Sequence, residues 1–319
     1  MKNVYIGVDV GGMTIKCGIV DKEGNILYKE SIKTINPKQS YMPFLISIKE
    51  LLVKTIAKAK ELKCTPKGIG FGIPGVVNNK TGSIDYVCNI NLFHVPLADY
   101  LKDLKIPVHL SNDANVACLA EQLFGVAKGY SSVVLLTLGT GIGGGVIIDN
   151  KLFEGNEGKG AELGHVTMVV DGEQCGCGRK GCFEAYASAS ALNKYTKLSM
   201  EKNKNSLMWK IAKNDIANAN GYTSFEAAKK GDVAAIDVVN KYIKYLGEGI
   251  LNYCNIFRPE AIVLGGGVSN QGDYLKGLLE DYCGRQFYGY RETPKVEILI
   301  AKLKNDAGII GAAALCFND

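Results

Sequence analysis

A strand, a glycine turn and a second strand occur twice in this chain, 128 residues apart. The first copy spans residues 4–20 and turns at Gly11 and Gly12, and the second copy is the run LTLGTGIGGGVIID at residues 136–149. Gly139 of the second copy corresponds to Gly11 of the first, and an aspartate closes each copy. A unit that returns at this distance predicts a duplicated fold, because like sequences build like supersecondary structures.

Both glycine turns suit phosphate binding. A turn without side chains lets backbone N–H groups approach a phosphate, and in the first copy Thr14 and Lys16 add a hydroxyl and a positive charge. A glycine pair in a hairpin also serves as a plain turn, so one copy alone is weak evidence. Two copies that face each other hold an extended polyphosphate from both sides, and we therefore predict nucleotide binding.

Strands alternate with helical patterns in the remaining sequence, which predicts the α/β class. An amphipathic helix is expected at residues 41–62. After the cysteine-rich stretch at residues 175–182 the chain is expected to be mostly helical, at 185–198 and 225–257. A third glycine turn, residues 265–267, follows a buried strand. That turn either lets an adenine ring and a ribose lie against bare backbone or is only a tight corner.

Asn112 and Asp113 lie where a strand at residues 108–110 gives way to a helical pattern at 114–124. In open α/β sheets ligands gather at the carboxyl ends of strands. One interpretation is that Asp113 only caps the helix. The other is that its carboxylate accepts a hydroxyl proton as that oxygen attacks a γ-phosphoryl group.

Cys175, Cys177 and Cys182 form a C-x-C-x4-C run set among glycines, with His165 shortly before it. Three thiolates and one imidazole complete the tetrahedral shell of zinc and leave no position for a reacting water, so we predict a structural metal. A pair of disulfides or scattered free thiols are the alternatives. They are disfavoured because we expect no secretory segment and because the other cysteines show no paired spacing.

The same loop is expected to hold Glu162 and Glu184 near His165. If one ring nitrogen of His165 binds the metal, the other is available to a ligand, with its tautomer fixed by the metal. Taken alone, Glu184 is better explained as a first-turn carboxylate of the helix that follows it. The metal loop thus predicts a group of polar side chains that a structural ion orients.

Charge and hydrophobicity exclude two classes of function. The 37 basic and 32 acidic residues are interspersed and give a net charge of +5, without the basic cluster that a nucleic-acid surface needs. No run approaches the roughly 18 apolar residues that span a bilayer, and the first residues lead directly into a strand pattern. We expect a soluble, cytoplasmic protein that binds neither nucleic acid nor membrane.

Taken together, these motifs resemble the ROK family (repressors, open reading frames and kinases) of the actin-like and hexokinase ATPase superfamily. The resemblance covers the whole chain. Its most specific part is the E-x-G-H pair of Glu162 and His165, followed by C-x-C-G-x-x-G-C-x-E from Cys175 to Glu184.

The resemblance implies a two-lobed actin-like ATPase fold, in which two α/β lobes of ribonuclease-H-like topology flank a deep cleft. The expected small lobe comprises residues 1–112 and the returning C-terminal segment 304–319. The expected larger lobe, residues 113–303, carries the zinc loop.

The resemblance also implies roles for individual residues, with Asp113 as the catalytic base. The implied sugar ligands are Gly75, Asn89, Asn112, Asp113, Glu162, His165 and Glu184. The implied ligands of ATP and its Mg²⁺ are Asp9, Gly11, Gly12, Thr14, Lys16, Gly139, Thr140, Gly141, Gly143, Gly265, Gly266, Gly267 and Ser269. The implied ligands of a structural Zn²⁺ are His165, Cys175, Cys177 and Cys182.

The implied reaction is ATP-dependent phosphorylation of a hexose, and we expect glucose as the substrate and a homodimer or higher oligomer as the assembly. Kinases for fructose, N-acetylmannosamine, N-acetylglucosamine or allose share these motifs. Sugar-responsive repressors of the same family carry a DNA-reading domain ahead of the first glycine turn. Here eight residues precede Asp9, too few for a helix-turn-helix, so we expect an enzyme.

Two positions depart from the family pattern. Met13 stands where the family commonly has threonine, with Thr14 one residue later. Leu92 stands where many glucose-phosphorylating relatives carry tryptophan or another bulky aromatic residue. The second departure affects either substrate specificity or packing alone.

Overall fold

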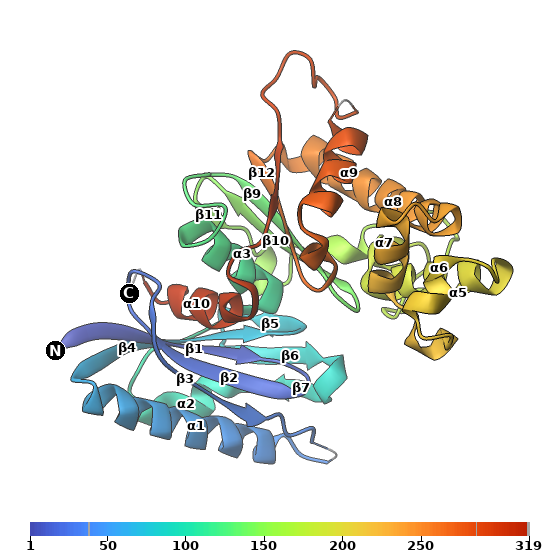
Figure 1. The fold of residues 1–319 in the computed structure, drawn as a ribbon. Coiled ribbons are helices and arrows are strands. Elements are labelled where there is room, and N and C mark those ends of the chain that lie inside the picture. The colour runs from blue at the N-terminus through green and yellow to red at the C-terminus, as the bar shows by residue number, and fades with distance from the viewer. Residues whose placement is uncertain (38, 285, 318–319) are drawn as a thin grey trace. The chain divides into compact units, whose positions relative to one another are not determined.

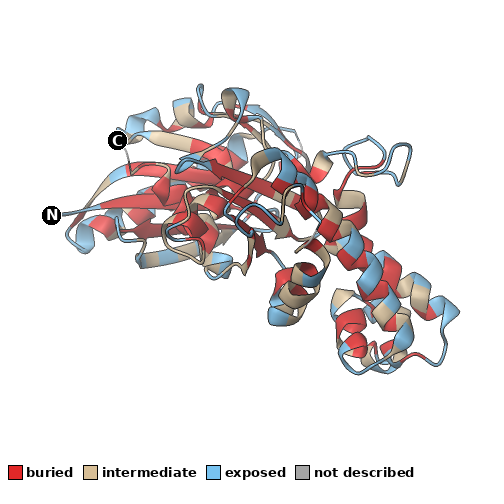
Figure 2. Cartoon of the chain, turned by 90° about the horizontal axis from the view of Figure 1, so that it is seen from above, coloured by how far each residue is buried: buried red, intermediate tan, exposed pale blue. Residues whose placement is uncertain are grey.

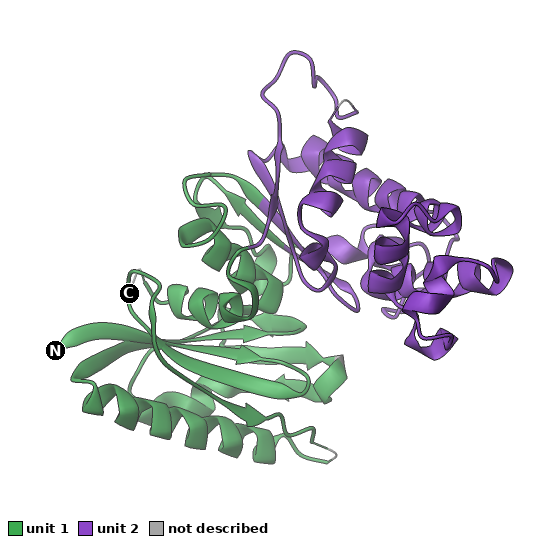
Figure 3. Cartoon of the chain, in the orientation of Figure 1, with its two compact units in different colours: residues 1–133, 145–161, 302–319 green, residues 134–144, 162–301 purple. Residues whose placement is uncertain are grey.

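The computed structural model describes residues 1–37, 39–284 and 286–317. The chain divides into two compact units (Figure 3). Unit 1 comprises residues 1–133, 145–161 and 302–319, and unit 2 comprises residues 134–144 and 162–301. The helix that begins at Asp113 belongs to unit 1. The lobe boundary at residue 112 stays a prediction.

Unit 1 is built on a five-stranded sheet with the order β3-β2-β1-β4-β8. The strands are β1 (Lys2–Val10), β2 (Thr14–Val20), β3 (Ile26–Lys33), β4 (Cys64–Ile73) and β8 (Val108–Asn112). Strand β1 pairs antiparallel with β2 and parallel with β4, and β4 pairs parallel with β8, with Ile73 opposite Asn112. The carboxyl ends of β4 and β8 therefore lie side by side.

Helix α1 (Met42–Glu61) covers one face of this sheet, together with α2 (Leu97–Leu101) (Figure 1). The helix predicted at residues 41–62 is confirmed, because Tyr41 and Leu62 are its two cap residues. Its buried side chains recur at helical spacing and join the strand residues in one core. The spacing of apolar residues in the sequence was thus sufficient to predict helix α1.

The opposite face carries α10 (Ala307–Ala314), which also packs on α3 (Asp113–Leu123) (Figure 1). Glycine makes this contact possible, because a Cβ at Gly70 in β4 would lie 1.7 Å from the carbonyl oxygen of Ala312. A Cβ at Gly7 in β1 would lie 1.9 Å from the carbonyl oxygen of Ile309. The helix backbone therefore rests directly on the strands, and the C-terminal segment is part of unit 1.

A small three-stranded sheet in unit 1 was not predicted. It has the order β5-β6-β7, with β5 at Val76–Asn78, β6 at Ser83–Val87 and β7 at Leu92–Val95. Leu92 is fully buried in the core of unit 1. At the departure from the family pattern, Leu92 therefore packs into this core.

The second five-stranded sheet has the order β11-β10-β9-β12-β13, the same arrangement as the first. Its strands are β9 (Val133–Leu138), β10 (Ile142–Ile148), β11 (Lys151–Leu152), β12 (Ala261–Gly265) and β13 (Glu297–Ile300). Like β4 and β8 in the first sheet, β12 and β13 pair in parallel. The duplication read from the glycine turns is therefore present in the strand order, and the predicted α/β class is confirmed.

Unit 2 adds helices α4 (Glu184–Ala187), α5 (Ala189–Lys202), α6 (Leu207–Ile211), α7 (Gly221–Lys229), α8 (Val233–Phe257) and α9 (Asp273–Cys283). The helix predicted at 185–198 is broken at Ser188, because the Ser188 hydroxyl accepts a hydrogen bond from the Ala191 amide and so caps α5. Burial follows the strands and the inner faces of the helices (Figure 2). None of the described helices combines the length and the apolar character that crossing a bilayer requires.

Asp21 closes the first copy of the repeat and is 2% exposed. Its carboxylate accepts hydrogen bonds from the Asn25 backbone amide at 2.8 Å and from Lys2 Nζ at 2.8 Å. Burial alone would raise the pKa of Asp21, but Lys2 and Asn25 hold it below its ordinary value. A lowered pKa in the folded state stabilises the fold above the unfolded pKa of about 4, and this contribution is lost as the pH falls below that value.

We expect Asp21→Asn to lower the free energy of unfolding by about 1–3 kcal/mol at pH 7, because charge-assisted hydrogen bonds are replaced by neutral ones. The difference from the unaltered protein should shrink as the pH falls below about 4. Urea unfolding at a series of pH values measures both effects. The matched control is Asp149→Asn, since Asp149 occupies the same place in the second copy but is exposed. An equal loss in both variants would contradict the explanation.

Candidate functional site

The first glycine turn joins β1 to β2 and is closed by its own backbone. The Gly11 amide donates to the Thr14 carbonyl at 3.0 Å, and the Gly11 carbonyl accepts from Thr34 Oγ1 at 2.7 Å. Asp9, the penultimate residue of β1, forms an ion pair with Lys16 at 3.1 Å. Met13 is 84% exposed at the tip, so its side chain extends away from this pair of charges into solvent.

Asn89 lies against this turn from within the same unit. It belongs to a short 3-10 helix, Cys88–Ile90, between β6 and β7. A Cβ at Gly12 would lie 3.3 Å from Asn89 Nδ2, so the bare backbone of Gly12 makes room for the amide. The structure thus brings together a predicted sugar ligand and a predicted phosphate turn that are far apart in sequence.

Gly75 and Asn112 meet at the carboxyl ends of β4 and β8. Asn112 Nδ2 donates to the Gly75 carbonyl at 3.1 Å. Gly75 has φ = +126°, and a Cβ there would lie 2.4 Å from the Tyr86 carbonyl oxygen, so only glycine fits. The two parallel strands therefore fix the Gly75 turn against the start of α3.

Asn112 is the N-cap of α3, since its Oδ1 accepts from the Ala114 amide at 2.8 Å. Asp113 is the first residue of the helix, half-buried, and its Oδ1 accepts from the same amide at 2.8 Å. The capping role that the sequence left open for Asp113 is thus filled by Asn112. The Asp113 carboxylate therefore lies at the N-terminus of α3, next to the cap residue.

The second glycine turn joins β9 to β10 and uses several of its own amides internally. The Gly139 amide donates to the Gly141 carbonyl at 3.0 Å, and the Gly143 amide donates to Thr137 Oγ1 at 3.0 Å. The Ile142 amide donates to Glu184 Oε2 at 2.8 Å. The amides of Gly139, Ile142 and Gly143 are therefore engaged in holding the shape of this turn.

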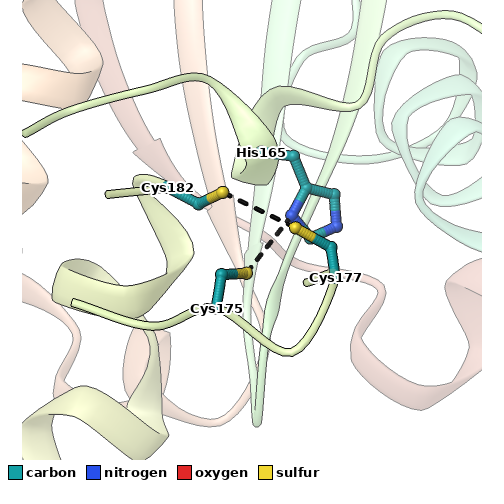
Figure 4. A group of neighbouring side chains, drawn as sticks. All are labelled: His165, Cys175, Cys177 and Cys182. Atoms are coloured by element: carbon teal, nitrogen blue, oxygen red, sulfur yellow. Dashed lines mark hydrogen bonds between the residues drawn. The ribbon is translucent and has the colours of Figure 1, made fainter. Parts of the chain in front are cut away.

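His165, Cys175, Cys177 and Cys182 converge on one point, as Figure 4 shows. Their ligand atoms all lie within 4.8 Å of one another. Cys175 Sγ lies 3.7 Å from His165 Nδ1, and Cys177 Sγ lies 3.7 Å from Cys182 Sγ. In a tetrahedral zinc site with Zn–S bonds of about 2.3 Å, neighbouring ligand atoms lie about 3.8 Å apart. The four residues therefore fit a zinc ion, and the sulfur separation is too long for a disulfide.

The thiols of this cluster differ in electrostatic environment. Burial raises the pKa of Cys175 to about 12, whereas a hydrogen bond from the Arg179 backbone lowers the pKa of the exposed Cys177. Thiolates this close repel one another, so full ionisation requires a cation among them. The donor set supplies the soft ligands that zinc prefers.

Glu162, His165 and Glu184 gather around the same cluster. Glu184 Oε1 lies 3.5 Å from Cys175 Sγ, while its other oxygen holds the Ile142 amide. The Glu162 side chain reaches solvent, yet the groups around it remove enough water to raise its pKa, and the Glu184 carboxylate adds to the shift. Glu184 is also the first residue of α4, so both interpretations of this residue apply.

The third glycine turn follows β12 and borders a pocket of about 360 Å³. Gly266 has φ = +82°, and the Ser269 hydroxyl donates to its carbonyl at 2.7 Å, so that hydroxyl is used within the turn. Of the predicted nucleotide residues in this turn, Gly267 lines the pocket. The other polar residues that line it are Asn193, Asn220, Tyr222, Asn270 and Gln271.

Sequence analysis missed the residues of this pocket outside the glycine turn. They come from the starts of α5 and α7 and from the 3-10 helix Val268–Gln271 that follows the turn. A local signal for one wall was present, since Asn220 and Thr223 form the capping box that begins α7. A capping box predicts where a helix begins, but it does not predict which other segments pack against that helix.

A sequence model of the ROK family matches residues 5–318. The chain is 36% identical over 318 residues to a glucokinase of Thermotoga maritima, an alignment that covers 97% of this chain and 96% of the relative. It is 30% identical to a xylose repressor of Caldicellulosiruptor bescii, covering 98% of this chain and 78% of the repressor.

A solved structure with the same fold is a ROK family glucokinase from Streptomyces griseus in complex with glucose and AMPPNP. The TM-score is 0.81 at 34% sequence identity, and the match covers 99% of this chain and 100% of that one. The predicted two-lobed fold is confirmed by this match.

Proposed function

The chain belongs to the ROK family, and on that basis we propose that it is a glucokinase, which transfers the γ-phosphoryl group of ATP to glucose. ATP-dependent phosphorylation of a sugar follows from the end-to-end identity with glucokinases. Within the molecule, the observation that carries the proposal is the bond from Asn112 to the Gly75 carbonyl. This bond places Asp113, the next residue, close to the Gly75 turn, whose backbone N–H and C=O groups can hydrogen-bond to a ligand rich in hydroxyls.

We assign Asp113 the role of general base. The carboxylate accepts the proton of the attacking sugar hydroxyl as that oxygen approaches the phosphorus. Asn112 and Gly75 orient the sugar. The Asn112 side-chain amide and the Gly75 carbonyl are held in place by the hydrogen bond between them. A base held by the first turn of a helix keeps its position during the reaction, because the backbone is rigid there.

The other proposed sugar ligands are Asn89 in unit 1 and Glu162, His165 and Glu184 in unit 2. A hexose presents hydroxyls that both donate and accept, and amide, imidazole and carboxylate groups satisfy both functions. We propose glucose as the substrate, and the alternatives are fructose, N-acetylmannosamine, N-acetylglucosamine and allose.

We propose that the first and second glycine turns bind the phosphates and that the pocket beside Gly267 binds the adenosine. A pocket of about 360 Å³ is within the range of small-ligand sites. Asp9 offers carboxylate oxygens to Mg²⁺, which would supply charge compensation for the transferring group. Lys16, already paired with Asp9, adds a second positive charge on the protein side.

We infer that His165, Cys175, Cys177 and Cys182 hold a structural zinc ion. The ion fills its shell with protein ligands and therefore supplies order, not a reacting water. Since His165 Nδ1 faces the cysteines, its Nε2 is the nitrogen left for the sugar. Glu184 links the cluster to the second glycine turn through the Ile142 amide, so the loop and the turn are ordered together.

Release of ADP measured across a panel of sugars tests the proposal. With Mg²⁺ and ATP present, we expect kcat/KM for glucose to exceed that for fructose, mannose, N-acetylmannosamine, N-acetylglucosamine and allose by at least about tenfold. A faster alternative hexose would replace glucose as the substrate and leave the sugar kinase in place. A protein that phosphorylates no sugar would refute the proposed function.

A further inference from the structure

The loop from Glu154 to Gly160 is fastened to the part of unit 1 that carries the proposed sugar ligands. Glu154 Oε2 accepts from Asn79 Nδ2 at 3.0 Å, and the Asn79 amide donates to the Glu157 carbonyl at 3.2 Å. Asn79 follows β5, the first strand of the small sheet. This sheet begins after Gly75, and Asn89 lies in the connection between its other two strands. One carboxylate oxygen of Glu154 is therefore tied to the sugar-binding side.

The other carboxylate oxygen of Glu154 is tied to the proposed base. Ser111 Oγ donates to Glu154 Oε1, and Ser111 is fully buried in β8, one residue before Asn112 and two before Asp113. The same Ser111 hydroxyl accepts from Asn115 Nδ2 at 3.3 Å, on the first turn of α3. The carboxylate thus reaches both the strand that ends at the base and, through Ser111, the helix that begins with it.

The backbone of Glu154 makes a third connection. Its carbonyl accepts from the Gly160 amide at 2.7 Å, and the close approach of Gly155 to Gly160 admits no side chain. Gly160 lies two residues before Glu162 in the chain. The Glu154 carbonyl therefore holds the start of the segment that leads to the E-x-G-H motif.

From these contacts we propose that Glu154 is a positioning residue of the kinase, one that sets the distance between Asp113 and the hydroxyl ligands Gly75 and Asn89. The proposal rests on the proposed function, since it takes Asp113 as the base. Glu154 touches no reacting atom and acts through Ser111 and Asn79. Phosphoryl transfer is sensitive to such positioning, because misplacement by about 1 Å costs on the order of a hundredfold in rate.

The test compares Glu154→Ala with Glu157→Ala. Glu157 lies in the same loop and its carboxylate accepts from Asn78 and from Lys159, yet it makes none of the bonds to Ser111. We expect Glu154→Ala to lower kcat by about 10- to 100-fold and to raise the sugar KM, with the ATP KM within about twofold. Glu157→Ala should stay within about threefold of the unaltered enzyme. Rates are referred to the folded fraction, measured by thermal unfolding of each variant.

A double-mutant cycle with Ser111→Ala separates positioning from general destabilisation. If Glu154 acts through Ser111, the double variant is no slower than the slower single variant. Glu154→Gln, which keeps size and one acceptor, should recover part of kcat. If Glu154→Ala does not fold, Ser111→Ala is used in its place, because that substitution removes only one oxygen atom.

Equal kcat and sugar KM in Glu154→Ala and Glu157→Ala would overturn the proposal, as would additive losses in the cycle. The unaltered enzyme, assayed in parallel, distinguishes this failure from a failure of the proposed function. If it phosphorylates glucose while Glu154→Ala keeps full turnover, only the positioning role is refuted. If it phosphorylates no sugar, the proposed function fails and the positioning role fails with it.

Discussion

Replacing Asp113 by alanine is expected to lower kcat by a factor on the order of 10² or more, because the attacking hydroxyl then loses its proton acceptor. Sugar and ATP affinities should stay largely intact. Asn112 keeps its bond to the Gly75 carbonyl and still caps α3, so the sugar-binding side of unit 1 does not depend on the Asp113 carboxylate. Steady-state kinetics and calorimetric titration of glucose measure the two quantities.

Asp113→Asn is the stricter form of this experiment, since the amide keeps the shape and still accepts from the Ala114 amide but takes no proton at neutral pH. We expect it to be as slow as the alanine variant. Asp103→Ala, which removes an exposed carboxylate of the same unit, should leave kcat unchanged. Near-normal turnover in Asp113→Asn would remove Asp113 from the role of base.

Cys177→Ser is expected to cost the protein its metal and most of its affinity for sugar. The hydroxyl of serine is a poor zinc ligand, and a structural site with three ligands binds far more weakly. Without the ion the loop that carries Cys175 no longer holds His165 and Glu184 in place. We expect the bound zinc to fall from about one atom per chain to near zero and the sugar KM to rise about tenfold or more.

Elemental analysis and kinetics on the same sample check both parts of this expectation. Cys64→Ala serves as the control, since Cys64 is a buried cysteine of unit 1 outside the cluster. It should keep zinc and KM. A Cys177→Ser protein that is free of zinc and has an unchanged sugar KM would show that the metal does not order the sugar ligands.

The sequence was informative wherever the evidence is local. The metal ligands lie within one short stretch, from His165 to Cys182, and their spacing restricts which side chains can meet. The helix at Met42–Glu61 follows from apolar residues at a period that only a helix buries on one side. The duplicated glycine turns predicted a repeated strand–turn–strand unit, because each turn specifies the hairpin that it closes, and the two sheets do share one strand order.

The tertiary structure decided the contacts between segments far apart in the chain. Leu92 is a core residue because β7 closes a small sheet that no local pattern announced, and Asn112, not Asp113, caps α3. Glu154 reaches Ser111 across 43 residues of sequence. Such contacts depend on the register of paired strands, in which a slip of one residue turns every side chain to the other face, and no single stretch of sequence contains that register.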